Sequence, residues 1–323
     1  GASVVCSPLG LFSQNAPANF KPLQKIDGEK PRNVIFILTD DHRYDFMGFT
    51  GKVPWLQTPN LDKLAAEGAW FKNAFVTASL SSPSRASILT GQYSHTHTIV
   101  DNQAPDPGNL TFFPQYLQAA GYQTAFFGKW HMGADTDAPR PGFTHWESFR
   151  GQGVYYNPSL NIDGKQVAYK DSIYITDLLT EHTLKWLKES DKTKPFFVYL
   201  SHKAVHAGFM PAKRHKGMYK DKKYTLPITY DQTKTGAYRD LKWPEWVAQQ
   251  RVSWHGVDYM YNKNDDLNTM VQDYCETLMG VDESVGAVMD YLKKEGLDES
   301  TLVIYMGDNG FSWGEHGLID NRH

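Results

Sequence analysis

The chain has 323 residues, with 33 basic and 36 acidic side chains and a net charge of −3. This length can bury a large core, and the balanced charge excludes a general nucleic-acid binder. Two cysteines, Cys6 and Cys275, are too few for a disulfide scaffold, and no apolar run is long enough to span a membrane.

The first fourteen residues are apolar and uncharged and then give way to a polar stretch. This composition is typical of the apolar part of a secretory signal, and a buried N-terminal arm is the alternative. We therefore predict a signal remnant or arm over residues 1–25 and a periplasmic or secreted protein.

Short apolar runs predict four buried strands, and amphipathic patterns predict five helices. The predicted strands cover residues 34–38, 122–127, 196–200 and 302–306. The predicted helices run from 59 to 67, from 83 to about 90, from 113 to 120, from 172 to 189 and from about 268 to 295. This alternation predicts an α/β fold with a mostly parallel sheet covered by helices on both faces, and a ligand site at the carboxyl ends of the strands.

Residues 208–265 show no clean period and are rich in Lys, Tyr, Trp, Pro and Asn. The basic run from Lys213 to Lys216 is compatible with a solvated face. The alternative is a lid or substrate wall that faces a polyanion.

The string from Ser81 to Gly91, Ser-Ser-Pro-Ser-Arg-Ala-Ser-Ile-Leu-Thr-Gly, predicts a helix start. Ser82 suits the N-cap and Pro83 the first helical position, which Pro tolerates because its missing N–H would have no partner there. Ser81 would then lie where free N–H groups and the helix dipole favour an anion. A well-capped helix with a solvated Arg85 is the alternative.

Acidic and amide side chains follow two of the predicted strands. Asp40 and Asp41 come after the first, and Asp308 and Asn309 come after the last. Oxygen donors of this kind suit Ca²⁺ or Mg²⁺ rather than a soft metal, and the resemblance described below favours Ca²⁺ over Mg²⁺. Converging carboxylates also need a cation, because each raises the pKa of the others.

Basic side chains and histidines follow the same strand ends. Arg85, Lys129 and Lys203 would form a clamp for an oxyanion, and His131 and His206 would move protons near neutral pH. Each of these residues taken singly is also compatible with a structural role.

Together these motifs resemble the type I, formylglycine-dependent sulfatases of the alkaline-phosphatase-like superfamily. The resemblance rests on Asp40-Asp41, the Ser81–Gly91 string, Gly128-Lys129-Trp130-His131-Met132-Gly133, Lys203-Ala204-Val205-His206, Gly307-Asp308-Asn309-Gly310 and Gly314-Glu315-His316-Gly317, in that order. It implies an alkaline-phosphatase-like fold and release of sulfate from a sulfated carbohydrate such as a glycosaminoglycan, mucin or algal glycan. It also implies that residues 26–323 form an incomplete catalytic domain without the family's small C-terminal domain.

The resemblance assigns a role to each of these residues. Ser81 would be the precursor of 3-oxoalanine (formylglycine), made by a sulfatase-maturating enzyme, and its hydrate would attack sulfur. Arg85 and Lys129 would stabilise the hydrate and the sulfate, His206 would protonate the leaving oxygen, and His131 would take a proton from the second hydroxyl. The Ca²⁺ ligands would be Asp40, Asp41, Asp308 and Asn309.

The resemblance also suggests substrate contacts. The stretch around Asn102, with residues 113–117, is similar to N-acetylglucosamine-6-sulfatases. Sulfatases usually carry a Lys shortly after Gly-Glu-His-Gly, whereas this chain has Asn321 beside Arg322. The candidate substrate-binding residues are Gln152, His202, Lys203, His316, Asn321 and Arg322.

Two other functions stay open at this point. One is a phosphatase or phosphonate monoester hydrolase of the same superfamily, with Ser81 unmodified. The other is an inactive homologue that binds sulfated glycans. A two-metal phosphatase would need a second set of Asp and His ligands, which the sequence does not supply.

Overall fold

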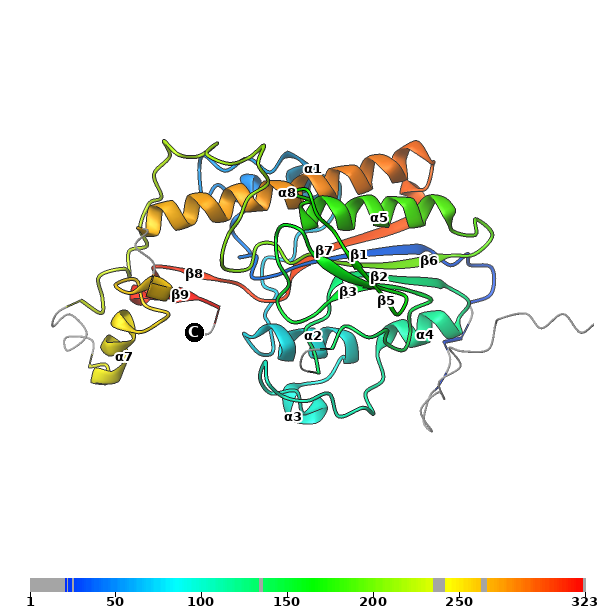
Figure 1. Ribbon diagram of the computed structural model, residues 1–323, viewed down its shortest axis with the longest axis horizontal. Helices are drawn as coiled ribbons and strands as arrows, with labels where there is room; N and C mark the ends of the chain where they lie inside the picture. The colour runs from blue at the N-terminus through cyan, green and yellow to red at the C-terminus, as the bar shows by residue number, and fades with distance from the viewer. Residues whose placement is uncertain are drawn as a thin grey trace, which may run out of the picture.

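A seven-stranded sheet between two layers of helices dominates the computed structural model (Figure 1). The structure describes residues 21, 23–24, 26–133, 136–234, 242–262 and 266–321. The predicted arm at 1–25 lies almost entirely outside these residues. Within the described residues, no helix has the length and apolar character needed to cross a membrane.

The strand order is β5-β4-β3-β2-β6-β1-β7. Strands β3, β2, β6, β1 and β7 are parallel to one another, whereas β4 pairs antiparallel with both β3 and β5. The strands are β1 (Asn33–Thr39), β2 (Gln123–Lys129), β3 (His145–Phe149), β4 (Ser159–Ile162), β5 (Lys165–Ala168), β6 (Phe196–Ser201) and β7 (Thr301–Gly307). This confirms the predicted α/β class and all four predicted strands, which lie side by side as β2-β6-β1-β7, with β7 at one edge of the sheet. Strands β3, β4 and β5, which complete the other side of the sheet, were not predicted, because they are short and carry polar residues.

Helices cover both faces of the sheet (Figure 1). On one face lie α1 (Pro59–Glu67), α5 (Ile175–Glu189) and α8 (Leu267–Lys294), and on the other lie α2 (Ser81–Thr90), α3 (Ser94–His97) and α4 (Phe113–Ala119). Successive side chains of a strand point to opposite faces. Ile35 and Ile37 of β1 therefore join the core under α5 and α8, whereas Phe36 and Leu38 join the core under α2 and α4.

Helix α2 begins earlier than the sequence predicted. It starts at Ser81, and its N-cap is Leu80, whose side chain makes no capping bond. Pro83 is therefore the third helical residue. Its lack of an N–H removes no hydrogen bond there, because the first N–H groups of a helix have no intrahelical acceptor. Asn102 supplies the missing cap, because its Oδ1 accepts the backbone N–H of Ser82 at 3.0 Å.

The described parts of the segment predicted to lack a clean period, residues 208–234 and 242–262, are mostly irregular. They contain α7 (Glu245–Gln249) and the short 3-10 helices Gln250–Val252 and Met260–Asn262. Part of the basic run anchors it, since Arg214 pairs with Asp177 of α5 and Glu283 of α8. A small hairpin, β8 (Ser312–Trp313) with β9 (Ile319–Asp320), lies beside this segment and near α7 (Figure 1).

Candidate active site

Three carboxylates meet where β1 and β7 end. Asp40, Asp41 and Asp308 are each at most 2% exposed, and one oxygen from each lies within 4.8 Å of the others. The topology explains the meeting, because β1 and β7 are parallel neighbours whose carboxyl ends share one edge. The backbone N–H of Asp41 donates to Asp308 Oδ1 at 2.9 Å, which ties the two strand ends together.

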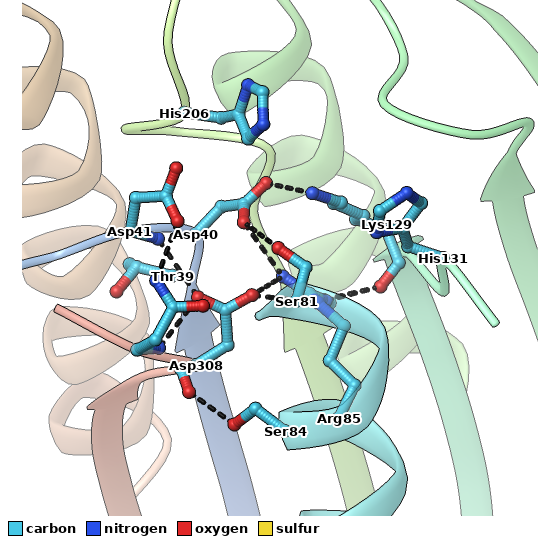
Figure 2. A network of polar contacts seen from close by, with 12 residues as sticks. Thr39, Asp40, Asp41, Ser81, Ser84, Arg85, Lys129, His131, His206 and Asp308 are labelled. Atoms are coloured by element: carbon cyan, nitrogen blue, oxygen red, sulfur yellow. Dashed lines mark hydrogen bonds and ion pairs between the residues drawn. The ribbon is translucent and has the colours of Figure 1, made fainter. Parts of the chain in front are cut away.

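Helix α2 points its first turn at this acidic cluster (Figure 2). The Ser81 hydroxyl is 1% exposed and donates to Asp40 Oδ1 at 3.0 Å. One turn later, the Arg85 guanidinium pairs with Asp308 at 3.0 Å and lies 3.6 Å from Asp40. The same side chain donates to Ser201 Oγ and to the Lys129 carbonyl at 2.8 Å each. Arg85 is therefore a fixed, buried cation and not a solvated one.

Lys129, at the end of β2, brings a second cation to the cluster. Its ammonium forms an ion pair with Asp40 Oδ2 and donates to Gln152 Oε1 at 2.5 Å. The structure thus brings Gln152, predicted only as a substrate contact, beside the clamp. Lys203, after β6, is 5% exposed, and its ammonium lies 4.7 Å from the centroid of the Tyr155 ring.

The charges of the cluster divide the three carboxylates. Burial alone would raise the pKa of Asp40, but the charges of Lys129 and Arg85 hold it well below its usual value. Burial and the neighbouring Asp40 and Asp308 raise the pKa of Asp41 well above its usual value. Burial and Asp40 raise the pKa of Asp308 to about 6. Two of the three acids are therefore poorly compensated by the chain's own cations.

The two histidines of the prediction lie at the same edge. Burial, followed by the charge of Lys129, lowers the pKa of His131 to about 2, and its Nδ1 is buried without a partner. Burial lowers the pKa of His206 to about 4. The Nδ1 of His206 lies 3.2 Å from the Ala207 carbonyl, which only accepts, so Nδ1 carries the proton in the neutral ring. Its Nε2 is then the atom free to take up a second proton.

The acidic cluster has the chemistry of a hard-cation site. Asn309 is 2% exposed, and its Nδ2 donates to Asp41 Oδ1 at 2.7 Å while its Oδ1 is buried without a hydrogen-bond partner. A buried, unpartnered amide oxygen beside three buried carboxylates offers four oxygen donors to one ion. The residues present therefore fit Ca²⁺ or Mg²⁺.

Two predicted substrate contacts lie elsewhere. His202 is fully buried, its Nε2 lies 3.1 Å from Ser284 Oγ of α8, and its Nδ1 is buried without a hydrogen-bond partner, so the side chain packs between β6 and α8. Its assignment as a substrate contact stays a prediction. His316 is exposed, and its Nδ1 lies 2.9 Å from Gln232 Oε1 in the irregular segment. Arg322 lies outside the described residues.

Two residues at the site were not singled out as functional. Asn102, noted only for resemblance, caps α2 beside Ser81. The Tyr155 hydroxyl donates to the His206 carbonyl at 2.7 Å, and its ring lies against the Lys203 ammonium. Tyr155 therefore positions two candidate groups at once. A loop tyrosine carries no sequence signal of such a role.

Comparisons with known proteins agree with this geometry. A family model described as Sulfatase matches residues 32–323. The chain is 32% identical to the N-acetylglucosamine-6-O-sulfatase of Bacteroides thetaiotaomicron, over 99% of this chain and 64% of that protein. It is 28% identical to PehA of Trinickia caryophylli, described as a multifunctional alkaline phosphatase superfamily protein, over 89% of this chain and 65% of that protein. The chain thus spans a little less than two thirds of these relatives.

Solved structures show the same fold. One of them, a protein in complex with its substrate D-glucosamine-2-N,6-O-disulfate, has a TM-score of 0.74 and 32% sequence identity, over 90% of this chain and 68% of that chain.

Proposed function

The chain belongs to the sulfatase family, and from this we propose that its site hydrolyses a sulfate ester of a sugar. The observation that carries the proposal is the first turn of α2, where the Ser81 hydroxyl meets Asp40 between two buried cations, Arg85 and Lys129. This arrangement offers an oxyanion two fixed positive charges beside a reactive side chain.

A Ca²⁺ ion would be held by Asp40, Asp41, Asp308 and Asn309. When bound, it supplies positive charge that compensates the buried carboxylates and polarises the sulfate oxygens. Without it, the raised pKa values of Asp41 and Asp308 would leave the cluster partly protonated near neutral pH.

Ser81 is proposed as the precursor of formylglycine, whose hydrate supplies a nucleophile that can also release the sulfate afterwards. Asp40 is a weak base because its pKa is low, so it would not activate an unmodified Ser81 well. Arg85 and Lys129 orient the oxygens of residue 81 and of the sulfate. Because both are buried and hydrogen-bonded, they need no rearrangement during the reaction.

Protons are moved by the two histidines. We assign His131 the proton that a hydroxyl of residue 81 loses, because its buried Nδ1 has no partner in the protein. Its pKa of about 2 makes it a weak base in the empty site, so the negative charge of the bound sulfate ester would first have to raise that pKa, as for His206. His206 would deliver a proton from Nε2 to the leaving sugar oxygen. Its ring is neutral without substrate, and the negative charge of a bound sulfate ester raises its pKa toward the working range.

The decisive experiment measures the mass of the peptide that contains Ser81, in protein made in its native host, together with sulfate release. Conversion to formylglycine removes two hydrogens. The matched control is Ser87→Ala on the same helix, which leaves residue 81 intact and whose hydroxyl contacts Thr77 and His97 and not the acidic cluster. Active enzyme with an unmodified Ser81 would contradict the mechanism.

We further propose a glucosamine-type 6-O-sulfate as the substrate. The support is the 32% identity to an N-acetylglucosamine-6-O-sulfatase and the likeness to a structure that holds a 6-O-sulfated glucosamine. A panel of monosaccharides sulfated at a single position tests this. A higher kcat/KM for a galactose sulfate or a 4-O-sulfate would refute it.

A phosphonate or phosphate monoester hydrolase is the second candidate, favoured by the 28% identity to PehA. Within the described residues, Asp40, Asp41 and Asp308 form the one group of three acidic, His or Cys side chains close enough to hold a metal. This disfavours a two-metal phosphatase. Parallel assays with phenyl phosphonate, phosphate and sulfate esters separate the two, and sugar binding without turnover would indicate an inactive homologue.

We also propose that the protein acts in the periplasm or outside the cell, and that a maturating enzyme modifies it. The support is the apolar, signal-like composition of the first fourteen residues and the proposed formylglycine. Fractionation of native-host cells tests the location. Recovery of the protein only from the cytoplasm would contradict it.

A further inference from the structure

We propose that Asn321 is a fifth ligand of the cation at the acidic cluster and not a substrate contact. The proposal rests on the proposed function for the identity of the ion. The side-chain amide oxygens of Asn321 and Asn309 would both coordinate the cation, although the two residues lie on different segments.

Two hydrogen bonds hold the backbone of Asn321 in place. It follows β9, and its N–H donates to Asp320 Oδ1 at 2.6 Å. The other oxygen of Asp320 is held by His255 at 2.8 Å and by the Tyr261 hydroxyl at 2.5 Å. The carbonyl of Asn321 accepts the hydroxyl of Ser79, two residues before Ser81. Residue 321 is thus fixed between the irregular segment and the start of α2.

The side chain of Asn321 enters the acidic cluster. It is 8% exposed, and its Nδ2 donates to Asp41 Oδ1 at 2.6 Å. Asn309 donates to the same oxygen at 2.7 Å, and the Oδ1 atoms of both amides are buried without a partner. Two amides that share one acceptor and both leave an oxygen unpaired are poorly satisfied by the protein alone. A cation at Asp41 would bind both oxygens after each amide turns over.

The charge around Asp41 also favours a cation. Asp40 pairs with Lys129 and Arg85, and Asp308 pairs with Arg85. Within the described part of the chain, Asp41 has no such ion pair, and its side chain receives only the two neutral amides. A buried carboxylate stays ionised only when it is paired with a charge or bound to a metal, and otherwise takes up a proton. A neutral, oxygen-bearing residue at 321 leaves room for that metal, whereas a Lys there would take its place.

Calcium binding to the full chain tests the assignment without any turnover. Isothermal titration of the metal-free protein with Ca²⁺ should give an affinity about 10–100-fold weaker for Asn321→Ala than for the unmodified chain. The matched control is Asn161→Ala. Asn161 is also buried, and its amide donates to an Asp carboxylate at 3.3 Å, but it lies in β4 outside the cluster. This control should keep the original affinity. Equal affinities for Asn321→Ala and the unmodified chain would overturn the proposal.

Two further variants sharpen the result. Asn321→Asp keeps an oxygen and adds a negative charge, so it should bind Ca²⁺ more tightly than the original chain. Weaker binding by Asn321→Asp would overturn the proposal. This test remains available if Asn321→Ala fails to fold. Asn321→Lys should weaken Ca²⁺ binding, because its ammonium competes for Asp41. An unchanged Ca²⁺ affinity with a lower KM would instead place residue 321 at the substrate. If the chain with its original sequence does not bind Ca²⁺, the metal assignment itself is overturned. If the original chain binds Ca²⁺ and only the Asn321 variants bind it more weakly, the result supports the role of Asn321.

Discussion

Replacing Arg85 by Met removes a buried charge while keeping most of the aliphatic volume. The guanidinium is the only ion-pair partner of Asp308 within the described residues, whereas Asp40 keeps Lys129. The Lys129 carbonyl also stays satisfied, because the Ser201 hydroxyl donates to it at 2.7 Å. The loss therefore falls mainly on one carboxylate, and removing one partner of a buried pair costs about 3–5 kcal/mol.

We take about 3 kcal/mol, the lower end of this range, as the loss in free energy of unfolding, because Asp308 keeps the hydrogen bonds from the backbone N–H groups of Asp41 and Asn309. This loss sets the expected shift in Tm. Unfolding entropy of roughly 2.1 cal/mol/K per residue gives about 0.7 kcal/mol/K for a chain of this size. A loss of about 3 kcal/mol then lowers Tm by about 4–5 °C. Sulfate release should also fall by about 10²–10³-fold, as when one preorganised donor to a transition state is removed. Thermal unfolding in EGTA and a sulfate-release assay measure the two effects.

Arg251→Met is the matched control for stability. Arg251 is also buried, at 4% exposed, but its partner Asp258 is half exposed, so the pair contributes about 1 kcal/mol or less. Ca²⁺ should narrow the Tm gap between Arg85→Met and the unmodified chain, because the ion compensates Asp308. Equal Tm values for Arg85→Met and the unmodified chain, or equal losses at both arginines, would refute the reasoning.

Three further predictions concern the same edge of the sheet. Burial lowers the pKa of Lys203 to about 8, so its positive charge is lost as the pH rises through that value. We therefore expect kcat/KM to fall above pH 8. The Lys203→Arg variant stays charged and should not show this fall. An identical profile in both proteins would argue against a role for Lys203 in sulfate binding. Excess EGTA should abolish sulfate release and added Ca²⁺ restore it, whereas full activity in the chelator would rule out the metal. His202→Leu should change KM little, because this side chain contacts Ser284; a large rise in KM would return His202 to the substrate site.

Strands β1, β2, β6 and β7 could be predicted from sequence because each is a short apolar run that ends in polar residues. Strands β4 and β5 could not, since they form a short hairpin that carries polar residues. The start of α2 was predicted at Pro83 because local capping preferences favoured Ser82. The actual cap comes from Asn102, a residue twenty positions away that only tertiary packing brings to the helix.

Much of the site was predictable for a geometric reason. The carboxyl ends of parallel strands lie at one edge of the sheet, so Asp40, Lys129 and Asp308 were expected at the same edge once the strands were identified. That Lys129 of β2 reaches Asp40 across the intervening strand β6 is seen only in the structure. Side-chain direction was harder to predict. His202 and Lys203 are adjacent, but one contacts α8 and the other lies against Tyr155. Asn321 was predicted as a substrate contact from its place after a motif, and only the folded hairpin shows its amide on Asp41.

The burial of Ser81 has a consequence for the order of events in the life of the protein. Its side chain is 1% exposed, lies in the first turn of a helix and is hydrogen-bonded to Asp40 behind it. In the folded chain this side chain offers little surface to another protein. If Ser81 is oxidised as proposed, the modifying enzyme would act before α2 closes onto β1. The rate of folding would then limit the time available for the modification, and a molecule that folded first would keep its serine.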